Sequence, residues 1–175
     1  VEKVKNELQN ILSGKIRNSN DALIQTVANY LRSGKRASPV AEEKHQNKAE
    51  ETKRLIGFAE QNKLIFSDID EQNFVSSGAE QKVYIKDEHH VIKLNDAIYY
   101  ASWEDYFHNL LLNNYFFADT SYQLLGFFVK DQNCFAVVEQ PFVLANSLTN
   151  LNRVKEFLTN NGFVNTKNND YYHPQ

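Results

Sequence analysis

The sequence predicts an α+β fold, in which a helical N-terminal segment precedes a five-stranded antiparallel sheet with one packed helix. Residues 1–64 carry apolar side chains at helical spacing. From residue 65 onward, short β-branched and aromatic runs alternate with turn residues. A hydrophobic content of 42% and an aromatic content of 13% are typical of a packed core. A chain of 175 residues is long enough for one such core with a small appended part.

Three helices are expected in the N-terminal segment. The first has apolar residues at helical spacing and ends at Ser13-Gly14, and these residues are Val4, Leu8, Ile11 and Leu12. Asn20 or Asp21 can cap the second, which ends near Gly34 and has the face Leu23, Val27, Tyr30 and Leu31. Ser38 before Pro39 is a good start for the third. Residues 41–53 are polar all round, which predicts a solvated helix or a partly disordered linker before an apolar face at residues 55–59.

Five runs of strand-like composition follow, at residues 73–77, 80–86, 90–95, 122–130 and 133–143. Between the third and the fourth, residues 102–117 predict a helix capped by Ser102. Its apolar stripe consists of Trp103, Tyr106, Phe107, Leu110 and Leu111. Residues 147–163 predict a last helix, which ends at Asn161-Gly162.

Composition narrows the classes of function. A net charge of −3 and a pI near 6.0 give no basic field for nucleic acid, and the two short basic stretches near residues 15 and 35 are ordinary solubility features. Cys134 lies in an apolar run and is expected to be a small core residue. Because a single cysteine gives no disulfide framework, we expect a reducing cytoplasm. We expect no metal at the adjacent His89 and His90, which point opposite ways on a strand. No run is long and apolar enough for a membrane span, and the start does not resemble a signal peptide.

The unusual residue is Lys93, which stands between Ile92 and Leu94 in a run that reads as a core strand. Taken alone, it would be the solvent-facing position of an alternating strand. Gly78, likewise, would alone be an ordinary turn glycine. Lysine is seldom fully buried unless it has a partner, so a lysine in a core strand indicates a binding role. The order of the strands around Gly78 and Lys93 supports this interpretation for both residues.

The order of strands and these motifs resemble the small lobe of the protein-kinase-like fold. "SSGAEQKVYI" is similar to a degenerate glycine-rich loop, "VIKL" to the third-strand lysine motif, and "FAVVEQPFV" to the fifth strand and hinge. The resemblance implies that Lys93 holds the α- and β-phosphates of ATP. It further implies a nucleotide-binding set of Gly78, Ala79, Glu80, Gln81, Val83, Lys93, Val138, Glu139, Gln140 and Phe142.

More closely, several blocks between about Phe74 and Tyr172 are similar to the kinase-like domain of bacterial and phage polyvalent proteins. These blocks are "GAEQKVYI", "VIKLND", "SWEDYFHNLLLNNYFF", "YQLLGF", "VVEQPFV" and "NNGFVNTKNNDYY". After the helical segment at 1–64, which the apolar spacing predicts, the resemblance implies a kinase-like N-lobe at 65–144 and a post-hinge helix with the start of a catalytic lobe at 145–175. In that family the catalytic aspartate and asparagine and the metal-binding aspartate follow the last block, so no Mg²⁺ ligand is expected here. The chain begins at Val1 and contains no methionine, and we expect it to be cut from a longer protein.

A lysine with this role needs a carboxylate from the following helix, as the resemblance implies. With the apolar stripe turned toward the sheet, Glu104 lies on the flank of the buried face and is the expected partner of Lys93. Asp105, nearly opposite the core, is the second choice. Taken alone, Glu104 would be a first-turn acid that complements the helix dipole.

Some residues depart from the kinase pattern. Ala79 and Gln81 replace more flexible residues of the loop, and Pro141 has no N–H to offer adenine. The backbone near Glu139, Gln140 and Phe142 is therefore the expected adenine contact.

The resemblance implies ATP- and Mg²⁺-dependent phosphoryl transfer to an unknown acceptor, with this fragment itself inactive. The alternative is a non-catalytic half-kinase or pseudokinase that binds a protein partner in a mobile-element conflict system. A third interpretation is a small α+β binding domain without a nucleotide, in which Lys93→Ala would change stability alone.

Overall fold

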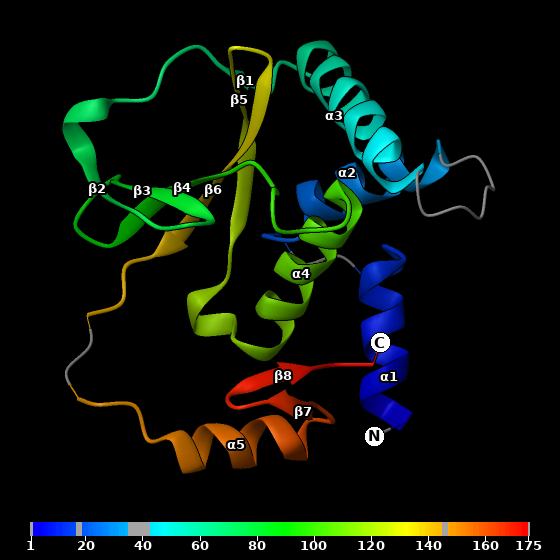
Figure 1. Cartoon of the computed structure of the whole chain (residues 1–175), viewed down its shortest axis with the longest axis vertical. Coiled ribbons are helices and arrows are strands. Elements are labelled where there is room, and N and C mark those ends of the chain that lie inside the picture. Colours follow the sequence, from blue (N-terminus) through cyan, green and yellow to red (C-terminus); the bar gives the residue numbers. More distant parts are fainter. Residues whose placement is uncertain (1, 17–18, 35–42, 145–146, 175) are drawn as a thin grey trace.

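A computed structural model describes residues 2–16, 19–34, 43–144 and 147–174, with the backbone alone for residues 2 and 43–47. Five helices are described: α1 (Glu2–Leu12), α2 (Ala22–Ser33), α3 (Glu43–Gln61), α4 (Trp103–Phe116) and α5 (Leu151–Asn160). The strands are β1 (Ile65–Phe66), β2 (Phe74–Ser77), β3 (Gln81–Ile85), β4 (His90–Asn95), β5 (Gln123–Lys130), β6 (Asn133–Pro141), β7 (Val164–Lys167) and β8 (Asp170–Tyr172). The α+β class is confirmed (Figure 1).

The main sheet has six strands in the order β1-β5-β6-β4-β3-β2. The five expected strands pair antiparallel, but β1 adds a sixth that runs parallel to β5, so the five-stranded antiparallel prediction is wrong in this detail. Gly126 makes the addition possible, because a Cβ at this position would lie 2.2 Å from the Leu64 carbonyl oxygen. That oxygen accepts a hydrogen bond from the Phe127 N–H at 2.8 Å.

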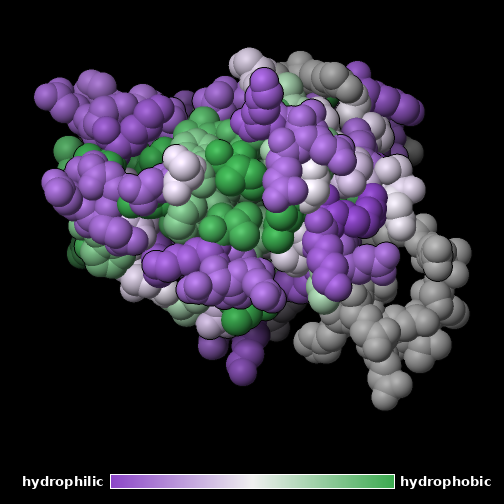
Figure 2. All heavy atoms as spheres, turned by 90° about the horizontal axis from the view of Figure 1, so that it is seen from above, coloured by the Kyte–Doolittle hydropathy of each residue, from purple (hydrophilic) through white to green (hydrophobic). Residues whose placement is uncertain are grey.

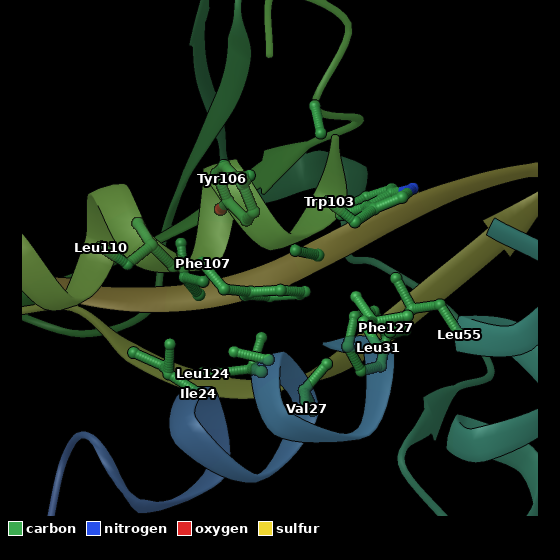
Figure 3. Packing of buried hydrophobic residues seen from close by; sticks show 14 of the residues in the cluster. Ile24, Val27, Leu31, Leu55, Trp103, Tyr106, Phe107, Leu110, Leu124 and Phe127 are labelled. Carbon is green, nitrogen blue, oxygen red and sulfur yellow. The ribbon is translucent and has the colours of Figure 1, made fainter. Parts of the chain in front are cut away.

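One face of the sheet carries the main hydrophobic core, and α2, α3 and α4 pack there. Figure 3 shows Trp103, Tyr106, Phe107 and Leu110 of α4 and Leu124 and Phe127 of β5 close to Ile24, Val27 and Leu31 of α2 and Leu55 of α3. Leu8 and Ile11 of α1 are also buried. The expected apolar faces of the first three helices are thus used by a single core that the N-terminal helices share with the sheet.

The opposite face of the sheet is less covered. Tyr84, Leu94 and Val137 form a small buried cluster there. Partly exposed apolar side chains surround it, and these are Phe66, Ile69, Ile92, Leu125, Phe128 and Phe135. Seen from above, exposed hydrophobic side chains lie between hydrophilic borders (Figure 2).

The polar first half of α3 is bound to the segment that leads into α4. Lys48 donates hydrogen bonds to the carbonyl oxygens of Ala97 and of Tyr100, the latter at 2.9 Å. The Glu51 carboxylate, buried at 4% exposure, accepts the Trp103 N–H at 2.8 Å, and Thr52 Oγ1 accepts Trp103 Nε1–H at 2.9 Å. A carboxylate at the first residue of a helix complements the helix dipole. The predicted helix is formed at residues 48–53, and Ala49, Glu50 and Lys53 are exposed on it. Lys48, Glu51 and Thr52 depart from the prediction of a fully solvated helix, because their polar groups bind the segment before α4 and the start of α4.

The predicted caps differ in outcome. Ser102 caps α4 as expected, since its Oγ accepts the Asp105 N–H at 3.0 Å. Asp21 stands at the start of α2 but makes no side-chain cap, because its carboxylate accepts a hydrogen bond from Asn114 of α4 at 2.8 Å. Ser38 and Pro39 lie outside the described residues.

After β6 the chain runs to α5 and the β7–β8 hairpin (Figure 1). Asn150 caps α5 by accepting the N–H groups of Asn152 and Arg153. Phe163 and His173 pack their rings against Phe116, at the C-terminal end of α4. The predicted helix at 147–163 is confirmed for its central part, 151–160, and is followed by the hairpin.

Candidate functional site

Lys93 lies in the middle of β4, between Val83 of β3 and Val138 of β6 in the strand register. Side chains of directly paired residues project on the same face of a sheet, and Val138 belongs to the core on the α4 side. Lys93 therefore projects toward the helix-covered face. It is only partly exposed, and burial lowers the pKa of its ammonium below the ordinary value.

The partner of Lys93 is an aromatic ring. Its Nζ lies 5.4 Å from the centroid of the Tyr122 ring, which is within the range of a cation–π interaction. Within the described ranges, no carboxylate forms an ion pair with Lys93. This geometry differs from the expected lysine–glutamate pair.

Glu104 is placed elsewhere. It is buried at 7% exposure, and its Oε1 accepts a hydrogen bond from Arg32 Nε of α2 at 2.9 Å. At about 100° per residue, Glu104 lies about 160° around α4 from Tyr106, which faces the sheet. The predicted partnership with Lys93 is therefore not formed. Asp105 does not form it either, because its side chain is exposed.

We expect Glu104→Gln to lower the free energy of unfolding by about 1–2 kcal/mol, because the ion pair with Arg32 becomes a hydrogen bond from the Arg32 guanidinium to an uncharged amide oxygen. Asp105→Asn, an exposed neighbour on the same helix turn, is the matched control and should cost less than about 0.5 kcal/mol. Urea denaturation measures both. A Glu104→Gln protein with unchanged stability but an altered Lys93 pKa would contradict this placement and support the predicted pairing of Glu104 with Lys93.

The turn between β2 and β3 holds the residues of the presumed phosphate loop. The Gly78 N–H donates to the Gln81 carbonyl oxygen at 2.9 Å and closes the turn. An added Cβ at Gly78 would meet only that oxygen, at 4.0 Å, so no close contact requires glycine here. Ala79 and Glu80 are exposed, and the Glu80 carboxylate is close enough to raise the pKa of Tyr100 and of Tyr122, although burial is the larger cause for both.

Strand β6 divides the expected hinge residues between the two faces. Val138 and Gln140 share the face of Lys93 by alternation. Glu139 lies opposite Ile92, on the other face, where its carboxylate forms an ion pair with Lys86 and has an oxygen 3.9 Å from His90 Nε2. Its side chain is thus directed away from the face that carries Lys93.

The expected backbone donors of the hinge are engaged in the sheet. The Phe142 N–H donates to the His89 carbonyl oxygen at 2.6 Å, and alternation along the ladder directs the Gln140 N–H to β4 as well. Val143 N–H makes no hydrogen bond to any residue that the structure describes. The sequence prediction named Phe142 and not Val143 as a backbone donor. Alternation of hydrogen bonds past Pro141 would have predicted that the Phe142 N–H points to β4 and the Val143 N–H away from it.

Tyr122 belongs to a group of three tyrosines with Tyr100 and Tyr106, of which only Tyr106 was expected in the core, as part of the apolar stripe. Tyr100 packs edge-on against Tyr106 at 5.2 Å between ring centroids. Burial raises the pKa of the Tyr106 hydroxyl well above 10.0, and Tyr100 and Tyr122 raise it further. A tyrosine in an apolar helical stripe was the available signal, because a buried hydroxyl needs a polar neighbour.

A cavity of about 470 Å³ lies elsewhere in the described part of the chain. It opens between α3, the segment before α4 and the β5–β6 turn, with Lys48, Tyr100 and Cys134 among its lining residues. None of the predicted site residues lines it. The described residues hold no group of three or more His, Cys, Asp or Glu side chains arranged for a metal ion.

Residues 48–175 match the sequence profile of a family described as a serine/threonine/tyrosine kinase found in polyvalent proteins. The chain belongs to this kinase family. The match begins at Lys48, inside α3, and so starts earlier than the resemblance at Phe74. No curated protein and no solved structure matches the chain. No helix among the described residues is long and apolar enough to span a membrane.

Proposed function

We propose that the chain is the ATP-binding small lobe of a kinase-like phosphotransferase of this family, and that it binds nucleotide without transferring phosphate by itself. The observation that carries the proposal is the placement of Lys93. It is a half-buried cation on the α4 face of the sheet, in register with Val83 and Val138 and without an ion-pair partner among the described carboxylates. Family membership supports the same function.

The geometry suggests how the residues would share the work. Lys93 would bind phosphate oxygens, since an ammonium without an ion pair is available for an anion. Val83, which is partly exposed, supplies apolar surface beside it for a planar base, and Val138 lies buried in the core on the other side of Lys93. The Val143 N–H would donate to the edge of the adenine in place of Phe142. ATP would bring Mg²⁺ with it, as the family resemblance implies.

We expect Lys93→Met to weaken ATP binding at least about tenfold, because one charge-assisted contact to phosphate is worth about 1.5–3 kcal/mol. Lys82→Met is the matched control, because Lys82 is an exposed lysine on the neighbouring strand. Isothermal titration with Mg·ATP measures both, and the control should retain its affinity. Equal affinities, or a wild-type protein that does not bind ATP, would contradict the proposal.

A non-catalytic interaction module remains the second candidate, and one observation favours it. The segment around α5 exposes large apolar side chains, among them Leu144, Leu148 and Leu151, at 78%, 99% and 57% exposure. Exposed apolar surface of this kind marks contact with another folded part or partner. If the wild-type chain does not bind ATP, this second function becomes the stronger one.

A further inference from the structure

An aromatic ring occupies the place beside Lys93 where a carboxylate was expected. The Tyr122 ring lies 5.4 Å from the ammonium, and both side chains are partly buried. We infer that Tyr122 is the positioning residue of Lys93, holding its ammonium over the ring and ready for a phosphate group. The contact stands by itself, whereas the phosphate-facing role rests on the proposed function.

The backbone of Tyr122 is fixed from both sides by one amide side chain. Asn114 of α4 accepts the Tyr122 N–H at 2.6 Å and donates to the Tyr122 carbonyl oxygen at 2.8 Å. Such a pair of bonds locks the residue just before β5 to the last turn of α4. The ring is thus held by main-chain contacts that do not depend on its own side chain.

The same amide connects Tyr122 to the N-terminal helices. Asn114 Nδ2 also donates to the Asp21 carboxylate at 2.8 Å, and both side chains are buried. A second support is Gln140, which donates to the Thr120 carbonyl oxygen at 2.7 Å, two residues before Tyr122. Helix α2, helix α4 and the end of β6 therefore all fix the position of this ring.

A ring and a carboxylate hold a lysine with different consequences. A carboxylate neutralises the ammonium, whereas an aromatic face attracts it through a quadrupole and leaves the net positive charge intact. Lys93 over Tyr122 therefore offers its full charge to an incoming anion. The full charge of Lys93 matters because the β2–β3 turn carries the Glu80 carboxylate, which repels an anion, where a glycine-rich loop would have further glycines.

The experiment compares Tyr122→Leu, which removes the ring, with Tyr122→Phe, which keeps it. The first readout is the proton NMR shift of the Lys93 ε-methylene group, which a ring face moves upfield. We expect the upfield shift to be kept in Tyr122→Phe and lost in Tyr122→Leu. The second readout is Mg·ATP affinity, which should fall about fivefold for leucine and stay within about twofold for phenylalanine.

Tyr30→Leu is the matched control, because Tyr30 also lies under a cation, with Arg54 Cζ at 4.9 Å from its ring centroid. It should change neither the Lys93 resonance nor the ATP affinity. A Lys93 ε-methylene resonance that stays at its wild-type position in Tyr122→Leu would overturn the inference. If Lys93→Met weakens ATP binding but Tyr122→Leu leaves the ATP affinity unchanged, the positioning role of Tyr122 would be overturned. The proposed function would then still stand. A wild-type chain without ATP binding would overturn the proposed function and the phosphate-facing role, while the resonance would still decide the contact.

Discussion

Replacing Asn114 by leucine is expected to lower the free energy of unfolding by about 3 kcal/mol. The buried amide joins three groups, because it donates to the Asp21 carboxylate and to the Tyr122 carbonyl oxygen and accepts the Tyr122 N–H. Leucine has a similar size but satisfies none of these groups. Each buried polar group left without a partner costs about 1–3 kcal/mol.

Thermal and urea denaturation measure this loss, and Asn113→Leu is the matched control. Asn113 lies one residue earlier on α4, is less buried, and makes one long hydrogen bond of 3.4 Å to the Thr120 carbonyl oxygen. The control should cost less than about 1 kcal/mol. Equal losses in the two variants would show that the Asn114 network does not stabilise the fold.

Gly126→Ala is expected to cost about 3 kcal/mol or more, because its Cβ would lie 2.2 Å from the Leu64 carbonyl oxygen and 3.0 Å from Phe66 Cε2. The oxygen belongs to the backbone and cannot rotate away. Strand β1 would have to leave β5, and the bond from the Phe127 N–H to Leu64 would be lost. Urea denaturation measures the cost.

Gly57→Ala is the control with the opposite sign. Gly57 lies inside α3, and no atom lies within 4 Å of an added Cβ. Alanine there should stabilise the protein by about 0.5–1 kcal/mol, because it restricts the unfolded chain and favours helix. A stable Gly126→Ala protein would mean that β1 does not pack on β5 as described.

Most of the fold was predictable because it follows from local patterns. Helical spacing located α1, α2 and α4, and β-branched runs located the five antiparallel strands. Strand β1 was missed, since its two residues pair only through a close backbone approach at Gly126. The burial of Glu51 was missed for a similar reason: its partner is the Trp103 N–H, 52 residues away.

The candidate site was less predictable than the fold. Lys93 and its neighbours in register followed from the strand motif, because pairing between adjacent strands is regular. Glu104 was expected beside Lys93, but it binds Arg32. The helical angle shows that Glu104 flanks the buried face, but it does not show which side chain Glu104 contacts there. Arg32 of α2, which binds Glu104, comes from a different helix 72 residues earlier. Tyr122 could not be assigned from sequence, because its position depends on Asn114 and Asp21.

The joint core has a consequence for how ligands act on the molecule. Helices α2, α3 and α4 and strands β5 and β6 contribute to one buried cluster, and β4 is paired with β6, so these elements should unfold together as a single cooperative unit. A ligand that binds only the folded state lowers the free energy of the entire unit in which it sits. Any molecule held at Lys93 would therefore protect the amide hydrogens of α2 from exchange as well as those of β4, although it would touch no residue of that helix.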